Sequence, residues 1–177
     1  MVAPAGPISL AEDYLEATLA GCAAFRTLVA AANPAAAKTS IHNDALPAPA
    51  AGEGYTKTEL QALHPFGLIK TDPEGGYAQG FSSANSDGSH NYRDGGKLIL
   101  RIYRQVTAGS EIADDERTWK NTVGQILDQL WALAGQAGYL AITAIAIEGW
   151  HRFHPDNEPA MGDVQGVTIG IHWGEAE

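Results

Sequence analysis

The sequence is poor in cysteine and in basic residues, and it has no long hydrophobic run. Cys22 is the only cysteine, so no intramolecular disulfide can form. The chain of 177 residues has 11 Lys and Arg against 21 Asp and Glu, a formal net charge of −10. This charge argues against a general nucleic-acid-binding surface and against an anionic membrane, because clustered cations must meet both. The longest apolar stretch, residues 139–147, is far shorter than the roughly 20 residues that span a bilayer.

Common phosphate-binding and catalytic sequence motifs are also missing. The chain contains neither of the glycine-rich phosphate-binding patterns and no G-x-S-x-G nucleophile turn. Cys22 falls on the apolar stripe of a predicted helix, where nothing nearby would make it a nucleophile. The acidic run at residues 114–116 is better explained as charge at a helix start than as a general acid/base pair. The sequence therefore predicts no enzyme activity, no catalytic residue and no cofactor.

His151 and His154 raise the alternative of a metal site. Further possible ligands are close in the sequence: Asp156, Glu158, Asp163 and His172. Zinc takes three or four His, Cys or carboxylate ligands. Residues three apart on an extended chain point to opposite faces, so the two histidines would need a turn at Pro155 to converge. We interpret the segment as a polar, aromatic-rich surface hairpin, assign no metal ligand, and keep a small metal-binding module as a minor alternative.

The first third of the chain predicts a helix followed by an irregular arm. Ser9 and Glu12 form a capping-box pattern, and Asn33-Pro34 ends the helix. Its apolar stripe has helical spacing: Leu15, Leu19, Cys22, Phe25 and Val29. Residues 33–54 are rich in Ala and Pro and predict an extended arm, in which Ile41 marks one short strand.

The middle of the chain predicts short elements and a second irregular segment. Residues 56–63 predict a short helix, and residues 66–70 predict a short strand. Residues 82–96 are nearly all Gly, Ser, Asn or other polar residues, and we expect a flexible loop there. A strand at residues 97–106 follows, and its mixed face suggests contact with a partner: Ile99, Arg101 and Tyr103.

The last third predicts one long helix and two strands. The helix begins at the acidic run and carries a long apolar stripe: Trp119, Val123, Ile126, Leu127, Leu130 and Leu133. Residues 139–147 are apolar on both faces, which predicts a central strand. The final strand, residues 164–173, alternates between apolar and small or polar positions. Together these elements predict a single α+β domain over residues 1–177, with an antiparallel or mixed sheet and two main helices on one face.

The order of these elements resembles the tail terminator proteins of long-tailed bacteriophages, also called tail completion or minor tail proteins. The resemblance covers about residues 9–31 and 97–174, and it rests on the first amphipathic helix, the strand KLILRIYRQV, the helix with Trp119, the strand YLAITAIAIEG and the closing IHWG. It implies a structural virion protein without catalytic residues, assembled in the host cytoplasm and placed at the tail–neck junction. Members of this family form a hexameric ring that caps the tail tube and joins it to the neck or head connector.

The resemblance also implies a ring lumen through which the genome passes. With −10 on each chain, we expect DNA to pass without specific binding. Two long irregular segments in one small domain indicate arms that order on neighbouring chains. A head–tail connector or neck (head completion) protein remains the alternative, because such a protein could share the small α+β design.

Overall fold

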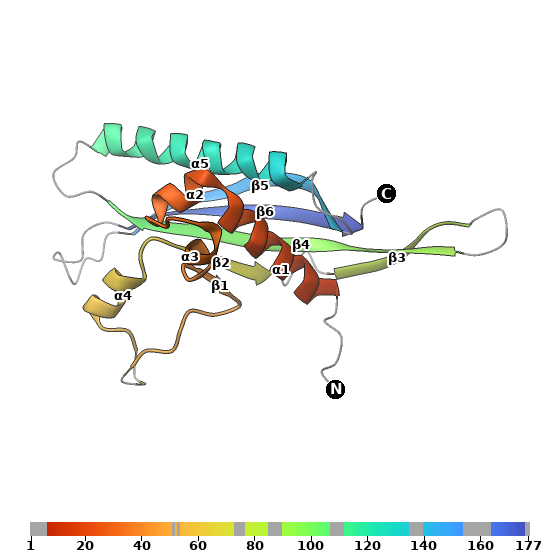
Figure 1. The fold of residues 1–177 in the computed structure, drawn as a ribbon, viewed down its shortest axis with the longest axis horizontal. Coiled ribbons are helices and arrows are strands. Elements are labelled where there is room, and N and C mark those ends of the chain that lie inside the picture. The colour runs from red at the N-terminus through yellow and green to blue at the C-terminus, as the bar shows by residue number, and fades with distance from the viewer. Residues whose placement is uncertain are drawn as a thin grey trace.

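The computed structural model describes residues 7–50, 52, 54–72, 77–84, 90–106, 112–134, 140–153 and 164–175. Within them the chain forms a single sheet, and the helices that contribute to the core pack against one of its faces (Figure 1). In chain order the elements are α1 (Pro7–Gly21), α2 (Ala23–Leu28), α3 (Pro34–Lys38), β1 (Ile41–Asn43), α4 (Lys57–Leu63), β2 (Phe66–Thr71), β3 (Tyr77–Ala84), β4 (His90–Gln105), α5 (Ile112–Ala134), β5 (Leu140–Phe153) and β6 (Val164–Glu175).

The sheet is mixed and has the strand order β1-β2-β4-β6-β5, with β3 also paired to β4. Only β1 and β2 run parallel among the described pairs. Residues 95–105 of β4 pair with β6, and residues 90–96 pair with β3. The β3–β4 hairpin consequently projects beyond the helices (Figure 1). The predicted single α+β domain is confirmed.

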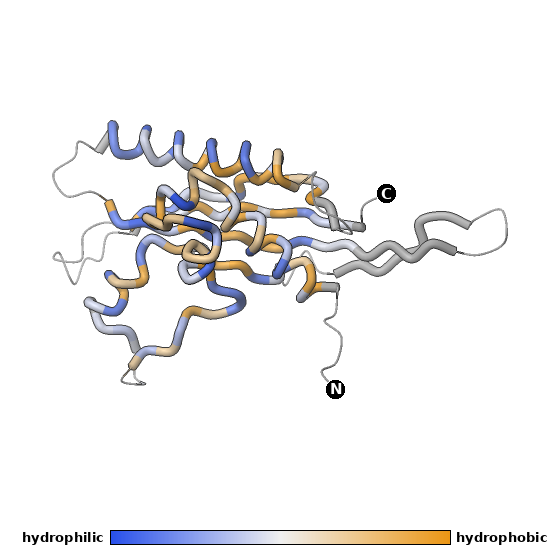
Figure 2. Tube along the Cα trace, in the orientation of Figure 1, coloured by the Kyte–Doolittle hydropathy of each residue, from blue (hydrophilic) through white to orange (hydrophobic). Residues whose placement is uncertain are grey.

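The core lies between the sheet and helices α1, α2 and α5. Alternate residues of β4 and β6 enter it, and all are fully buried or nearly so: Leu98, Leu100, Ile102, Val167, Ile169 and Ile171. Facing them is the apolar stripe of α5, which includes Trp119, Val123, Ile126 and Leu130. Figure 2 shows α5 hydrophilic on its outer side and hydrophobic residues along the strands beneath it. The alternation predicted for these two strands and the stripe predicted for this helix are both confirmed.

The predicted first helix differs from the observed one at its start and in its middle. It begins at Pro7, so Ser9 lies inside the helix and the predicted capping box is wrong. Glu12 instead accepts a hydrogen bond from the Thr71 hydroxyl at 3.1 Å. The helix is also interrupted at Cys22, which has extended backbone angles (φ −65°, ψ 119°) and separates α1 from α2.

The irregular segments contain more regular structure than the sequence predicts. The arm at residues 33–54 includes α3 and β1, and a reciprocal capping box at Thr56 and Glu59 begins α4. The loop expected at residues 82–96 is wrong where it is described, because residues 82–84 and 90–96 belong to β3 and β4. Residues 85–89 of that expected loop lie outside the described residues. The hairpin has no apolar alternation because most of it lies beyond the core.

The predicted position of one strand is wrong in a way that matters for function. Residues 139–147 predict a central strand, but β5 is an edge strand that pairs only with β6 among the described strands. It also continues to Phe153, which places His151 within the strand. None of the described helices is long and apolar enough to cross a membrane.

Candidate functional site

The clearest candidate surface is the free edge of β5. This strand has 14 residues, and its register with β6 runs from Leu140 to Phe153. No strand in the described residues pairs with its outer edge. An edge of this length presents a row of backbone N–H and C=O groups to which another chain can add.

Large apolar side chains are exposed beside this edge. Trp131 is 55% exposed, Ile147 43% and Trp150 42%. These are three of the four large hydrophobic residues that are exposed within the described part of the chain, the fourth being Leu10 on α1. Gathered exposed apolar residues in a small protein mark an interaction site more often than scattered ones do.

Two shallow hollows lie between α5 and β5. One of about 450 Å³ is lined by Leu127, Asp128, Trp131 and residues 143–145. The other, of about 230 Å³, is lined by Glu116, Trp119, Lys120, Gln165 and residues 150–152. We call the surface that includes these two hollows and the exposed Ile147 of β5 the tryptophan groove, and define it by six residues: Lys120, Leu127, Trp131, Ile145, Ile147 and Trp150.

The sequence places these side chains by two periodicities. Lys120, Leu127 and Trp131 lie on one flank of α5 because residues three, four or seven apart share a helix face. Ile145, Ile147 and Trp150 of β5 stand opposite Ile171, Ile169 and Val167 of β6, so they share the helix-covered face of the sheet. Register shifts after Ile142 and after Ile147 keep these residues on that face although their spacing is not strictly two.

A buried polar network fixes the helix that forms one wall of the groove. The Arg104 guanidinium donates to Asp115 Oδ2 at 2.8 Å and to Gln165 Oε1 at 2.7 Å, and it lies 5.0 Å from the centroid of the Trp119 ring. Asp115 is in the first turn of α5, which confirms the predicted helix-start position of the acidic run. Its side chain does more than the prediction states, because its carboxylate ties α5 to β4 and β6.

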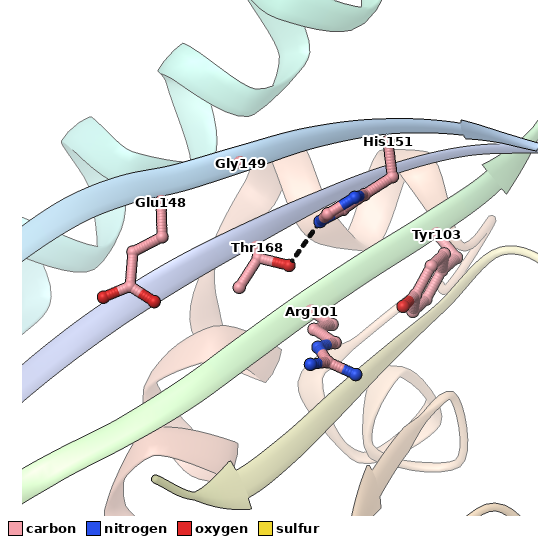
Figure 3. Close-up of a pocket in the computed structure, with 6 residues that line it drawn as sticks. All are labelled: Arg101, Tyr103, Glu148, Gly149, His151 and Thr168. Carbon is pink, nitrogen blue, oxygen red and sulfur yellow. Dashed lines mark hydrogen bonds between the residues drawn. The ribbon is translucent and has the colours of Figure 1, made fainter. Parts of the chain in front are cut away.

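A third hollow lies on the sheet face opposite α1, α2 and α5. It measures about 280 Å³ and is lined by Arg101, Tyr103, Glu148, Gly149, His151 and Thr168, as Figure 3 shows. Nearby, Lys97 contacts both Asp72 at 2.8 Å and Glu148 at 2.5 Å. These hydrogen bonds, first that to Asp72, raise the pKa of Lys97. Both carboxylates are engaged by one lysine, so they do not form a free acid/base pair.

The histidines considered as metal ligands do not come together in the described structure. His151 Nε2 lies 2.8 Å from Thr168 Oγ1 (Figure 3). His172 stands beside Ala144, while His151 stands beside Gly166, six positions away along β6, a separation of about 20 Å. His154, Asp156, Glu158 and Asp163 lie outside the described residues. Across the described ranges, no group of three or more His, Cys, Asp or Glu could hold a metal ion.

Cys22 is a buried thiol. It has no exposed surface, and its Sγ donates to the Thr18 carbonyl oxygen at 3.4 Å. Burial raises the pKa of Cys22 to about 12, so the thiol stays protonated at neutral pH. The predicted core position of this residue is confirmed.

The groove is the feature that sequence reasoning misses. The sequence suggests a partner contact at Ile99, Arg101 and Tyr103 but predicts no residue of the groove, although a signal is present in residues 139–147, which are apolar on both faces. That pattern indicates burial without saying whether the burying partner is the same chain or another. Since β5 is an edge strand, part of the predicted burial is absent from the single chain.

Comparisons with known proteins give a structural likeness and no relative by sequence. No family model and no curated protein matches this chain. Among solved structures, it is similar to a chain of a particle described as "Virion of native gene transfer agent (GTA) particle". The sequence identity is 12% and the TM-score is 0.39, over 92% of each chain.

Proposed function

We propose that this chain is a structural protein of a phage-like virion, a tail terminator that forms a hexameric ring. The ring would cap the tail tube and join it to the neck or head connector. One observation carries the assembly part of this proposal: β5 has the sequence of a buried strand but lies at the sheet edge beside exposed Trp131, Ile147 and Trp150. The place at the tail end rests on the resemblance of element order described above.

An assembly role follows from the physics of the β5 edge. Strands that are apolar on both faces are usually covered on both faces. A ring closes through heterologous contacts, in which one patch meets a different patch on the next copy. The projecting β3–β4 hairpin offers further contact area, since a two-stranded ribbon has little stability of its own in water. These features support self-assembly more than small-molecule binding.

The negative charge of the chain supports a channel through which DNA passes rather than a surface that binds nucleic acid. Each copy has a formal charge of −10, so six copies together carry about −60. Such a ring would repel the phosphates of DNA passing through its lumen. The enzyme class has less support, because the described hollows contain neither a free carboxylate pair nor an activated thiol.

Native mass spectrometry of the purified protein and imaging of purified particles test the proposal together. We expect a hexamer in solution and one ring per particle at the end of the tail tube. One ring at the portal would instead favour a connector or neck protein. A chain that is monomeric both in solution and in the particle would contradict the proposed ring.

A further inference from the structure

The hollow on the sheet face opposite α1, α2 and α5 is built from polar side chains of three strands. Its volume is about 280 Å³. Figure 3 shows Arg101 and Tyr103 of β4 on one side of Thr168, which belongs to β6, and Glu148 and His151 of β5 on the other. We call this cavity the polar hollow. A concave surface on which several polar groups converge is the usual form of a ligand site.

Two glycines of β6 let side chains of the neighbouring strands lie across this strand. A Cβ atom at Gly166 would lie 2.7 Å from the Tyr103 ring. A Cβ atom at Gly170 would collide with the side chains of Glu148 and Lys97. Because Cβ atoms do not approach other atoms so closely, this arrangement needs glycine at both positions. The polar hollow therefore lies between two places where side chains cross β6.

The lining of the polar hollow is held by interactions within the chain. The Tyr103 ring packs against the Phe66 ring, with 5.1 Å between their centroids. At the floor of the hollow, His151 Nε2 lies 2.8 Å from Thr168 Oγ1. Side chains that are already fixed lose less conformational entropy when a ligand binds, so such a lining favours binding.

Arg101 is the charged group of the polar hollow that has no counterion. The carboxylate of Glu148 also lines the hollow, but it pairs with Lys97 at 2.5 Å. Arg101 is exposed, and its side chain forms no ion pair or hydrogen bond within the described part of the chain. Asp72, the second carboxylate that contacts Lys97, does not line the hollow. Arg101 would therefore balance one negative charge in the hollow, and a second would have no counterpart.

A carboxylate matches this arrangement better than a phosphate does. It carries one negative charge at neutral pH, and a guanidinium binds it through two parallel hydrogen bonds. A phosphate group carries about 1.5 to 2 negative charges at pH 7, and its second charge would be repelled by Glu148. When His151 Nε2 carries the ring proton and donates it, the Thr168 hydroxyl can donate to the same carboxylate.

We propose that the polar hollow binds a carboxylate group through the Arg101 guanidinium. An Asp or Glu side chain of another polypeptide and a small free carboxylate share this chemistry, and the probes below distinguish them. The inference goes beyond the proposed ring, because it requires no particular oligomeric state.

Titration of the full chain with acetate tests the site. NMR of protein labelled at its threonine methyl groups follows the signal of Thr168, which is the signal missing from Thr168→Val. Acetate replaces chloride at pH 7 and constant ionic strength, and acetamide is the uncharged comparison. We expect a saturable shift of the Thr168 signal with acetate and none with acetamide. Equal shifts with the two compounds, or no shift with acetate, would overturn the inference.

Two variants that remove one positive charge distinguish the polar hollow from a general attraction of anions. Arg101→Gln removes the cation of the hollow, whereas Lys70→Gln removes a cation of the adjacent strand β2 that does not line it. We expect Arg101→Gln to weaken acetate binding roughly tenfold or more, and Lys70→Gln to change it about twofold or less. Equal weakening by both substitutions would contradict a site at Arg101.

Arg101→Lys keeps the charge but loses the paired hydrogen-bond geometry, so it should bind acetate with intermediate affinity. Circular dichroism melts verify that the variants fold. This conservative variant also keeps the test available where Arg101→Gln fails to fold. An Arg101→Lys chain that binds acetate as tightly as the wild type would contradict the paired hydrogen bonds of Arg101.

Three further probes identify the source of the carboxylate. A capped tripeptide with glutamate between two glycines presents the group as a polypeptide would, and butyrate presents it free. Peptide binding at least as tight as that of butyrate would assign the group to another polypeptide. Binding of butyrate without binding of the peptide would assign it to a small molecule. Inorganic phosphate that binds more tightly than acetate would overturn the assignment to a carboxylate.

Discussion

Strands β5 and β6 lie side by side and have similar apolar sequences. Apolar side chains that are buried in β6 have exposed partners in β5. Ile147 of β5 is 43% exposed, and Ile169, its register partner on β6, has no exposed surface. At the next register pair on the same face, Trp150 of β5 is 42% exposed and Val167 of β6 is fully buried. Helix α5 contacts β5, yet Ile147 and Trp150 stay exposed beside it, whereas Ile169 and Val167 of β6 lie within the core. Similar residues thus stabilise the folded chain in β6 and remain available for assembly in β5.

The polar ends of the two strands show the same contrast. Gln165 of β6 is 3% exposed and shares the buried network of Arg104 and Asp115. Its register partner on β5, Arg152, forms a more exposed ion pair with Glu116 at 3.3 Å. Each pair of neighbours therefore offers one substitution that probes folding and one that probes the surface.

The largest expected effect is at Arg104. Arg104→Ala leaves the buried Asp115 carboxylate without its cation, which should lower the free energy of unfolding by about 3–5 kcal/mol. Arg152→Ala removes a surface pair and should lower it by no more than about 1 kcal/mol. Urea denaturation of both variants measures the difference. Equal losses would show that the buried ion pair of Arg104 stabilises the fold no more than the exposed ion pair of Arg152.

The isoleucine pair gives the next effect. Ile169→Ala creates a cavity in a packed core and should cost about 2–5 kcal/mol of unfolding free energy. Ile147→Ala should change it by about 0.5 kcal/mol or less when measured on the single chain. If the chain assembles into the proposed ring, the same Ile147 substitution should weaken that assembly, which dilution followed by light scattering would reveal. An Ile147→Ala chain that unfolds as readily as Ile169→Ala would refute the division of roles.

A smaller effect on the free energy of unfolding is expected at the side-chain hydrogen bond that joins β5 to β6. Thr168 is 9% exposed, and its hydroxyl lies 2.8 Å from His151 Nε2. Thr168→Val removes this hydrogen bond and should cost about 1 kcal/mol. Thr143→Val, at an exposed position of β5, is the matched control and should leave stability nearly unchanged. Thermal melts of the two variants compare them directly, and an equal shift in both would assign the effect to β-propensity.

Much of the fold could be predicted from residue periodicity. The alternation in β4 and β6, the stripe of α5 and the short β1 and β2 follow from local pattern, because each buries a face against the same core. The short α4 also follows from local pattern, although none of its described residues is buried. The capping box could not be placed by pattern alone. Ser9 with Glu12 and Thr56 with Glu59 both fit it, and only the second pair begins a helix.

The candidate site was beyond sequence reasoning for a physical reason. Residues 139–147 are apolar on both faces, which indicates that the strand is buried. The local sequence does not show whether the residues that cover it belong to the same chain or to another. The β3–β4 hairpin escaped prediction because residues 82–96 are nearly all Gly, Ser, Asn or other polar residues, a composition that indicates a loop, although backbone pairing joins the two strands. Both failures concern parts of the chain that extend beyond the core of one copy.

The sheet edge opposite β5, formed by β1, supplies the test with the smallest expected effect on stability. Substitutions in the tryptophan groove should not change this effect. His42 and His64 flank the Phe66 ring at centroid distances of 5.9 and 5.0 Å, and burial lowers the pKa of both histidines. In the unfolded chain both histidines take up a proton near pH 6.5. In the folded chain they take up that proton only at lower pH. The free energy of unfolding should therefore fall as the pH drops from 7 toward 5.

His64→Gln isolates this contribution from that of Glu12. Burial raises the pKa of Glu12, so its protonation opposes the histidine effect as the pH falls. Burial lowers the pKa of His42 and of His64, so the wild type should lose more stability between pH 7 and pH 5 than His64→Gln. Trp150→Glu, in the groove, should keep the wild-type slope. Urea denaturation at a series of pH values measures the three curves, and parallel curves for wild type and His64→Gln would exclude His64 as a cause of the pH dependence.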